Sequence, residues 1–285
     1  MTGRTVAALL ARARAMGVDR LDAQLLIARQ LGRSRTWLIA HDDTVLDTAQ
    51  YQAVAADLAR RAAGVPLAHI TGEREFHGLV LQVTPEVLVP RPDTETLVDW
   101  ALELLGGALA DLQTPRVLDL GTGSGAIALA VKRACPRARV RATDVSPAAL
   151  EVARSNAAAL GLELQFDLGD WWQAVGTEPL DLVLSNPPYI AQGDAHLKAL
   201  VHEPLAALTP GGDGLGAIER IVAGAAQRMV PGAWLLLEHG HDQAAAVRQG
   251  LRGAGFTGVE TRRDLAGLER CTGASRGIPG TAPSR

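Results

Sequence analysis

The first 65 residues carry the spacing of amphipathic helices. Apolar residues recur three and four positions apart, as at Leu21, Leu25 and Leu26, and this spacing places them on one face of a helix. Residues that favour helix starts precede the apolar runs, at Asp19, at Ser34 and at Asp47 with Gln50 three positions later. Glycines that favour helix ends follow at Gly32 and Gly64. The pattern predicts a small helical bundle over residues 1–65.

Between residues 66 and 92 the pattern changes to short β-rich pieces. The segment "FHGLVLQVTPEVLVPRP" contains apolar residues interrupted by Gly78, Pro85 and Pro90. Glycine and proline stop strands and favour turns. We therefore expect a β-hairpin connector over residues 66–92.

From residue 93 onward, strand-like and helical segments alternate, which is typical of a parallel sheet with helices on both faces. The expected strands are 116–120, 140–144, 162–166, 180–186, 233–239 and two more around a turn within 256–274. A helix is expected after Ser146 and Pro147, ending at Gly161. The pattern predicts a doubly wound, seven-stranded α/β domain over residues 93–274. The polar Gly/Pro sequence over residues 275–285 predicts a disordered tail.

Composition narrows the class of protein. The chain has 285 residues, 47% of them hydrophobic, and no run approaches the roughly 18 uncharged apolar residues of a membrane helix. Arginines interrupt the N-terminal segment, unlike a secretory signal, so we predict a cytoplasmic protein without membrane contact. Cys135 and Cys271 lack metal-ligand spacing, and His239 and His241 have no third ligand nearby, so no metal is expected. A net charge of −3 argues against a dedicated nucleic-acid binder.

A glycine-rich loop follows the strand predicted at 116–120. Its residues are Gly121, Thr122, Gly123, Ser124 and Gly125, and a helix begins directly after them. Glycines let a ligand approach the backbone, and the helix N-terminus offers free N–H groups. Asp144 ends the next strand, nineteen residues after Gly125, where a carboxylate can accept both hydroxyls of a ribose. The G-x-G-x-G spacing favours S-adenosylmethionine over a dinucleotide, which uses G-x-G-x-x-G.

The segment "LGDWW" follows the third predicted strand. Asp170 can accept a hydrogen bond from the edge of an adenine, and Trp171 or Trp172 can cover its face. Large aromatic side chains are usually buried whatever their role. A core position for at least one of the two tryptophans therefore stays open.

The segment "SNPPYI" ends the fourth predicted strand, and the strand beside it in a doubly wound sheet carries the glycine loop. The side-chain oxygen of Asn186 and the carbonyl of Pro187 are acceptors that can hold both N–H bonds of a planar amide or amino group. Pro188 keeps the turn rigid, and Tyr189 offers an aromatic face and a hydroxyl. Such a site predicts methyl transfer to a planar nitrogen, on either a glutamine or an adenine.

The order of "GTGSG", Asp144 and "NPPYI" resembles class I S-adenosylmethionine-dependent methyltransferases. With "PLAHITGEREFHGL" (66–79), "LVPRPDTETLV" (88–98) and "LLLEHG" (235–240), nearly the whole chain is similar to the PrmC/HemK family of release-factor glutamine methyltransferases. The resemblance implies N5-methylation of the glutamine in the GGQ motif of peptide chain release factors, with the helical domain helping to grip the release factor. It also implies cofactor contacts at residues 121–125, Asp144, Trp171 and Asn186, and a glutamine held by residues 186–189.

Three features depart from the family pattern. His202 stands where an arginine is expected before Glu-Pro, His77 stands where an aromatic residue is common, and the C-terminal tail differs. These departures concern the substrate grip. Two alternatives remain: an adenine-N6 methyltransferase acting on DNA or RNA, in which a flipped base presents the same amino group, and a binding module whose cofactor is structural.

Overall fold

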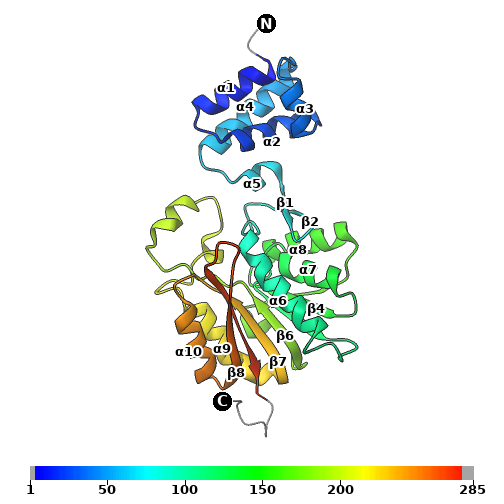
Figure 1. Ribbon diagram of the computed structural model, residues 1–285, viewed down its shortest axis with the longest axis vertical. Coiled ribbons are helices and arrows are strands. Elements are labelled where there is room, and N and C mark those ends of the chain that lie inside the picture. The colour runs from blue at the N-terminus through cyan, green and yellow to red at the C-terminus, as the bar shows by residue number, and fades with distance from the viewer. Residues whose placement is uncertain (1–3, 278–285) are drawn as a thin grey trace. The chain divides into compact units, whose positions relative to one another are not determined.

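The computed structural model describes residues 4–277 and divides into two compact units, Met1–Glu73 and Arg74–Arg285 (Figure 1). The division falls inside the segment 66–92 that the sequence predicts as a connector. Each unit has its own buried apolar core. No helix within residues 4–277 combines the length and apolarity needed to cross a membrane.

The first unit is a helical bundle. Its helices are α1 (Val6–Ala15), α2 (Arg20–Leu31), α3 (Arg35–Ala40), α4 (Thr48–Ala62) and α5 (Leu67–Thr71). The predicted helix starts are confirmed: Asp19 accepts from the N–H of Leu21, Ser34 from that of Trp37, and Asp47 forms a capping box with Gln50. These caps satisfy N–H groups that have no partner inside the helix. The apolar faces then pack around residues such as Leu9, Leu26, Leu38 and Leu58.

A two-stranded hairpin follows, formed by β1 (Glu73–Phe76) and β2 (Leu79–Gln82). Its turn contains His77, whose φ of 49° is unusual for a residue with a side chain. The N–H of His77 donates to Oε1 of Glu95 at 3.1 Å, and its Nε2 lies 3.0 Å from Oδ1 of Asp99. His77 thus ties the hairpin turn to helix α6 (Glu95–Gly106).

The second unit contains a seven-stranded sheet in the order β5-β4-β3-β6-β7-β9-β8. Its strands are β3 (Arg116–Leu120), β4 (Arg139–Asp144), β5 (Gln165–Leu168), β6 (Leu180–Ser185), β7 (Met229–Glu238), β8 (Phe256–Arg263) and β9 (Glu269–Arg276). Among the described strands, β9 runs antiparallel to both of its neighbours, β7 and β8, and the other neighbouring pairs are parallel. The chain leaves β3 towards β4 and β5 and then returns to β6 on the other side of β3. Ligands of such sheets bind where this reversal occurs, at the carboxyl ends of the strands.

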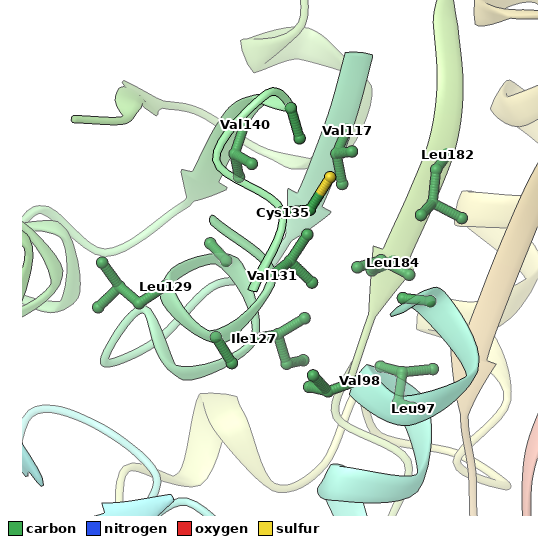
Figure 2. Close-up of a cluster of buried hydrophobic side chains, with 14 of the residues drawn as sticks. Leu97, Val98, Val117, Ile127, Leu129, Val131, Cys135, Val140, Leu182 and Leu184 are labelled. Atoms are coloured by element: carbon green, nitrogen blue, oxygen red, sulfur yellow. The ribbon is translucent and has the colours of Figure 1, made fainter. Parts of the chain in front are cut away.

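Helices cover both faces of the sheet, as predicted. They are α6, α7 (Ala126–Ala134), α8 (Pro147–Leu160), α9 (Gly216–Arg228) and α10 (Ala244–Gly253), with short 3₁₀ helices at η1 (Pro92–Thr94), η2 (Trp171–Ala174), η3 (Ala195–Ala199) and η4 (Leu205–Ala207). Leu182 and Leu184 of β6 pack towards α6 and α7 (Figure 2), whereas Val183 packs towards α9 and α10. Because alternate strand residues point to opposite faces and helices cover both faces, every residue of β6 is buried.

Several strand boundaries differ from the sequence prediction, and β7, for example, begins at Met229 and not at residue 233. The third strand begins at Gln165 because the ladder with β4 starts there, whereas Leu162 and Leu164 pack against the core ahead of the strand. The predicted disorder of residues 275–285 is wrong for Ser275 and Arg276, which belong to β9 and pair with β8. Residues 278–285 of that predicted tail lie outside the described residues.

Candidate active site

A cavity of about 500 Å³ opens at the carboxyl ends of β3, β4 and β6. It lies at the point where the strand order reverses. Most of the predicted site residues line it, namely Gly121, Thr122, Gly123, Ser124, Asp144, Asp170, Trp171, Asn186 and Pro188. Three predicted residues are not among those that line it: Gly125, Pro187 and Tyr189. The structure therefore gathers signals that are spread over more than sixty residues of sequence into one cavity.

The glycines of the loop have different tasks. Gly121 and Gly123 have φ values of 73° and 55°, which residues with a side chain rarely adopt. A Cβ atom on Gly121 would lie 3.4 Å from the ring of Trp171. A Cβ atom on Gly125 would lie 3.0 Å from the side chain of Leu129 and 3.2 Å from Cβ of Ala153. Gly121 and Gly123 thus shape the cavity, whereas Gly125 lets α7 pack closely on α8.

The carboxylate of Asp144 is held rigidly at the end of β4. Its Oδ2 accepts from the N–H of Gly123 at 2.9 Å, and its Oδ1 accepts from the N–H of Ser146 at 2.9 Å. Burial raises the pKa of Asp144, and these backbone hydrogen bonds oppose the rise. Each carboxylate oxygen has a second lone pair, so the group can also accept hydrogen bonds from a ligand in the cavity. This position fits the predicted ribose acceptor.

The two tryptophans after β5 separate into different roles. Trp171 lines the cavity. Trp172 donates from Nε1 to the carbonyl of Ile221 in α9 at 3.0 Å. A Cβ atom on Gly224 would lie only 2.2 Å from Cδ1 of Trp172, so the absence of a side chain there makes room for the indole. One tryptophan is therefore available to a ligand, and the other packs against α9.

Asp170 is not a free carboxylate. Its Oδ2 forms an ion pair with the guanidinium of Arg220, a residue of α9 that also lines the cavity. Arg220 was not predictable from the sequence, because it lies 50 positions from Asp170 and no local pattern links the two residues. A ligand that donates a hydrogen bond to Asp170 would therefore also lie close to the guanidinium of Arg220.

Asn186, the first residue of the NPPY turn, is oriented by a residue far away in sequence. Its Nδ2 donates to Oγ1 of Thr94 at 3.1 Å. With Nδ2 facing Thr94, Oδ1 has no hydrogen-bond partner among the described residues and can accept from a ligand. Thr94 lines the cavity and is 4% exposed. Thr94 belongs to the "PRPDTE" segment, one of those in which the chain is similar to the PrmC/HemK family. That segment therefore contributes a residue to the cavity.

The hydroxyl of Tyr189 is directed into the protein. It donates to Oε1 of Glu238 at 3.2 Å, and burial raises the pKa of Tyr189. Glu238, the last residue of β7, is 1% exposed, and burial raises its pKa to about 7. The backbone carbonyl of Tyr189 accepts from Nε2 of Gln243 at 2.9 Å. This hydroxyl, expected from sequence to face the substrate, is hydrogen-bonded to Glu238 instead.

A second wall of the cavity joins two distant segments. Arg91 and Pro204 line the cavity, as do Glu86, Val87, Leu88 and Pro90. The buried carboxylate of Glu203 accepts from the guanidinium of Arg91 at 2.5 Å and from the N–H of Val89 at 3.0 Å. Glu203 directly follows His202, the residue that departs from the family pattern. The "EP" dipeptide was the signal that could have identified Glu203 as an anchor.

Within residues 4–277, no group of three or more His, Cys, Asp or Glu side chains is arranged to hold a metal ion. His239, considered as a ligand from sequence, is buried between other partners. Its Nε2 lies 2.7 Å from Oγ1 of Thr272, and its Nδ1 lies 2.8 Å from the carbonyl of Gly240. Burial lowers the pKa of His239, which favours the neutral ring.

Comparison with known proteins identifies the family. Residues 4–72 match the PrmC N-terminal domain, and residues 94–229 match the methyltransferase small domain. A release factor glutamine methyltransferase of Bordetella pertussis is 52% identical over 260 residues, which cover 90% of this chain and 95% of the relative. The protein of the same name from Burkholderia pseudomallei is 50% identical, over 94% of this chain and 95% of its own length. That from Escherichia coli is 42% identical, over 89% of this chain and 91% of its own length. The chain belongs to the release factor glutamine methyltransferase family.

This finding confirms the resemblance drawn from the motifs. The family includes both units, because its two matched domains fall on either side of the hairpin. Solved structures with lower identity share the fold. The hMettl16 catalytic domain in complex with MAT2A 3′UTR hairpin 6 has a TM-score of 0.57 at 20% identity, covering 80% of this chain and 84% of that one. A methyltransferase from Pyrococcus furiosus has a TM-score of 0.52 at 19% identity, covering 70% and 90%.

Proposed function

We propose that this protein transfers a methyl group from S-adenosylmethionine to the side-chain amide nitrogen, N5, of the glutamine in the GGQ motif of peptide chain release factors. One observation carries the proposal beyond family membership. Asn186 lines the same cavity as the glycine loop, and its Nδ2 is bonded to Thr94, so its Oδ1 can accept an N–H bond from a substrate amide.

The residues that line the cavity fit S-adenosylmethionine. The backbone of residues 121–124 would lie against the cofactor, Asp144 would accept hydrogen bonds from its ribose, and Trp171 would cover its adenine. When bound, the cofactor supplies a methyl group on a positively charged sulfur, and its loss leaves S-adenosylhomocysteine. The fit of the glycine backbone and of the fixed Asp144 carboxylate supports this assignment.

The reaction needs orientation more than a strong base. The lone pair of an amide nitrogen is delocalised into its carbonyl, so the nitrogen is a weak nucleophile. In the proposed complex, Oδ1 of Asn186 and the carbonyl of Pro187 accept the two N–H bonds of the glutamine and raise the electron density on its nitrogen. The nitrogen forms one new bond to carbon and then releases one of its two protons to water. Pro188 keeps the spacing of the two acceptors fixed.

We further propose that the helical unit contributes to release-factor binding. Its match to the PrmC N-terminal domain supports this role. Location in the cytoplasm, and the absence of direct nucleic-acid and membrane partners, stay predictions from sequence.

One protein of this fold was solved in complex with an RNA hairpin, so the fold alone does not exclude the adenine-N6 alternative. An experiment can distinguish it from the proposed function. The test incubates the protein with labelled S-adenosylmethionine, a release factor, and DNA and RNA in the same reaction. We expect label in the release factor, and none in a release-factor variant whose GGQ glutamine is replaced by alanine. Label in nucleic acid and none in the release factor would overturn the proposed function. No transfer to any acceptor would favour the binding-module alternative.

A further inference from the structure

The segment after the NPPY turn pairs with the loop that precedes α9. The N–H of Ile190 donates to the carbonyl of Leu208 at 2.9 Å. The N–H of Gln192 donates to the carbonyl of Gly212 at 2.8 Å. These two bonds hold the chain beyond the turn, whereas the carbonyl of Tyr189, the last residue of the NPPY motif, has a side-chain partner.

That partner is Gln243, which lies directly before α10. Its Nε2 donates to the carbonyl of Tyr189 at 2.9 Å, and its Oε1 accepts from the N–H of Gly240 at 2.9 Å. A backbone carbonyl can only accept a hydrogen bond, and a backbone N–H can only donate one. The two partners therefore allow a single orientation of the Gln243 amide, which links the start of α10 to the NPPY turn.

The loop before α9 comes equally close to the same carbonyl. Gly214 has a φ of 86°, and a Cβ atom on it would lie 2.2 Å from the carbonyl oxygen of Tyr189 and 2.9 Å from Nε2 of Gln243. A side chain at this position would displace the carbonyl or its hydrogen bond. The absence of a side chain at Gly214 thus leaves room for the contact between Gln243 and the turn.

Part of this contact has a local explanation. A glutamine oxygen that accepts from the N–H of the residue three positions earlier resembles half of a capping box, which stabilises a helix start. That role uses only Oε1 of Gln243. A glutamate would supply the same acceptor, with a charge that favours a helix N-terminus. The bond from Nε2 to the carbonyl of Tyr189 is the part that stabilisation of the helix does not use.

We infer that Gln243 is a positioning residue that fixes the NPPY turn through the carbonyl of Tyr189. The inference rests on the proposed function, in which the side-chain oxygen of Asn186 and the carbonyl of Pro187 hold the acceptor nitrogen. The rings of Pro187 and Pro188 restrict φ at both positions, so the turn moves largely as a unit and a shift at Tyr189 also moves Pro187. Gln243 is not among the residues that line the cavity, so it acts on the turn and not on the cofactor.

Two substitutions of Gln243 separate the turn from the helix. Gln243→Glu keeps an acceptor for the N–H of Gly240 but replaces the donor to Tyr189 with an oxygen. Gln243→Met removes both bonds at similar length. We expect kcat to fall about tenfold in both variants, because the acceptor nitrogen loses its orientation. The thermal unfolding midpoint should fall only in Gln243→Met.

The matched control lies on the same helix. Arg248 of α10 forms an ion pair with Glu269 at 3.0 Å and makes no contact with the turn. Arg248→Met should therefore lower the unfolding midpoint and leave kcat at the wild-type level. This control shows how much of any change in kcat follows from a less stable α10.

A second pair of variants reaches the same carbonyl from the other side. Gly214→Ala places a methyl group against the carbonyl of Tyr189. Gly211 belongs to the same loop and has a φ of 85°, but the nearest atom to its hypothetical Cβ lies 4.0 Å away. Both alanine variants therefore carry similar backbone strain, and only one carries the clash. We expect kcat of Gly214→Ala to be at least about fivefold below that of Gly211→Ala.

The measurements are kcat and KM for methylation of a release factor, the Kd for S-adenosylmethionine, and the unfolding midpoint. A positioning role predicts that the loss appears in kcat while Kd stays within about threefold of wild type. Wild-type kcat in Gln243→Glu would overturn the inference, as would a loss no larger than in Arg248→Met or a loss confined to Kd. If Gln243→Met fails to fold, Gln243→Glu decides. Failure of Gln243→Glu to fold would also overturn the inference, because the contact would then serve the fold itself.

The outcome is distinguishable from failure of the proposed function. Wild-type protein that methylates nucleic acid and no release factor would overturn the proposed function alone. The same variants, compared on the nucleic-acid acceptor, would then test the role of Gln243, because an adenine amino group also presents two N–H bonds to the turn.

Discussion

Glu203 accepts hydrogen bonds from the side chain of Arg91 and from the backbone of Val89, although these residues lie 112 and 114 positions away in sequence. The carboxylate is 7% exposed. It joins the segment before η1 to the segment that follows the NPPY turn, and both segments line the cavity. One buried side chain therefore holds together two walls of the proposed cofactor and substrate site.

Replacing Glu203 should loosen this wall. Glu203→Ala leaves the N–H of Val89 and the guanidinium of Arg91 without their partner, but Arg91 is 36% exposed and can reach water. We expect a loss of about 1–3 kcal/mol in the free energy of unfolding and weaker binding of S-adenosylmethionine. Urea unfolding and calorimetry measure the two effects.

The matched control is Glu178→Ala, which breaks an ion pair with Arg139 in which both side chains are more than half exposed. Exposed pairs contribute at most about 1 kcal/mol. If the two variants lost equal stability and bound the cofactor equally well, Glu203 would not be an anchor of the cavity.

Asp144→Ala should act mainly on cofactor affinity. The variant loses the carboxylate that fixes the N–H groups of Gly123 and Ser146 and that would accept from the ribose. A hydrogen bond to a charged group contributes about 1.5–3 kcal/mol, so we expect the Kd for S-adenosylmethionine to rise at least about tenfold. Asp167→Ala is the control, because Asp167 pairs with Arg141 outside the cavity lining. An unaltered Kd in Asp144→Ala would show that this carboxylate does not bind the cofactor.

Two helical glycines should respond to alanine with opposite signs. Alanine in a helix is more stable than glycine by about 1 kcal/mol. Gly250 of α10 has no atom within 4 Å of its hypothetical Cβ, so Gly250→Ala should stabilise the protein. Gly224→Ala of α9 would clash with Trp172 and should destabilise it by about 1–3 kcal/mol. Thermal unfolding compares the two variants, and stabilisation by Gly224→Ala would mean that Trp172 does not fill this space.

The buried carboxyl group of Glu238 predicts a pH dependence of stability. Burial raises its pKa to about 7, so from about pH 4 to 7 the folded protein holds a proton there that the unfolded chain releases. The stabilising contribution of this proton is present at low pH and is lost as the pH rises through 7. Glu238→Gln removes the ionisation, so its stability relative to wild type should increase by up to about 3 kcal/mol between pH 5 and 8. Urea unfolding at both pH values checks this, and a constant difference would contradict it.

Local signals in the sequence predicted much of the fold. The caps at Asp19, Ser34 and Asp47 involve atoms within three residues of each other, so short patterns determine them. The order of strands and helices around the glycine loop followed in the same way. The start of β5 was not predictable, because it depends on where the ladder with β4 begins and not on the apolar pattern.

The site was predictable only in part, for a related reason. The NPPY turn and glycine loop are contiguous, but the partner of Asn186 is 92 residues away and that of Asp170 is 50 residues away. Such contacts depend on tertiary packing and have no local periodicity. The same packing turned the hydroxyl of Tyr189 towards Glu238, which aromatic composition alone does not indicate.

The central claim is that Asn186 orients a release-factor glutamine for methyl transfer. The most direct measurement is mass spectrometry of the GGQ peptide of a release factor after incubation with S-adenosylmethionine and either wild-type protein or Asn186→Ala. The account predicts one methyl group on the glutamine with wild type, and a rate at least about 100-fold lower with the variant, while cofactor affinity changes less. An unmodified glutamine with active wild-type protein, or equal rates for the two proteins, would contradict it.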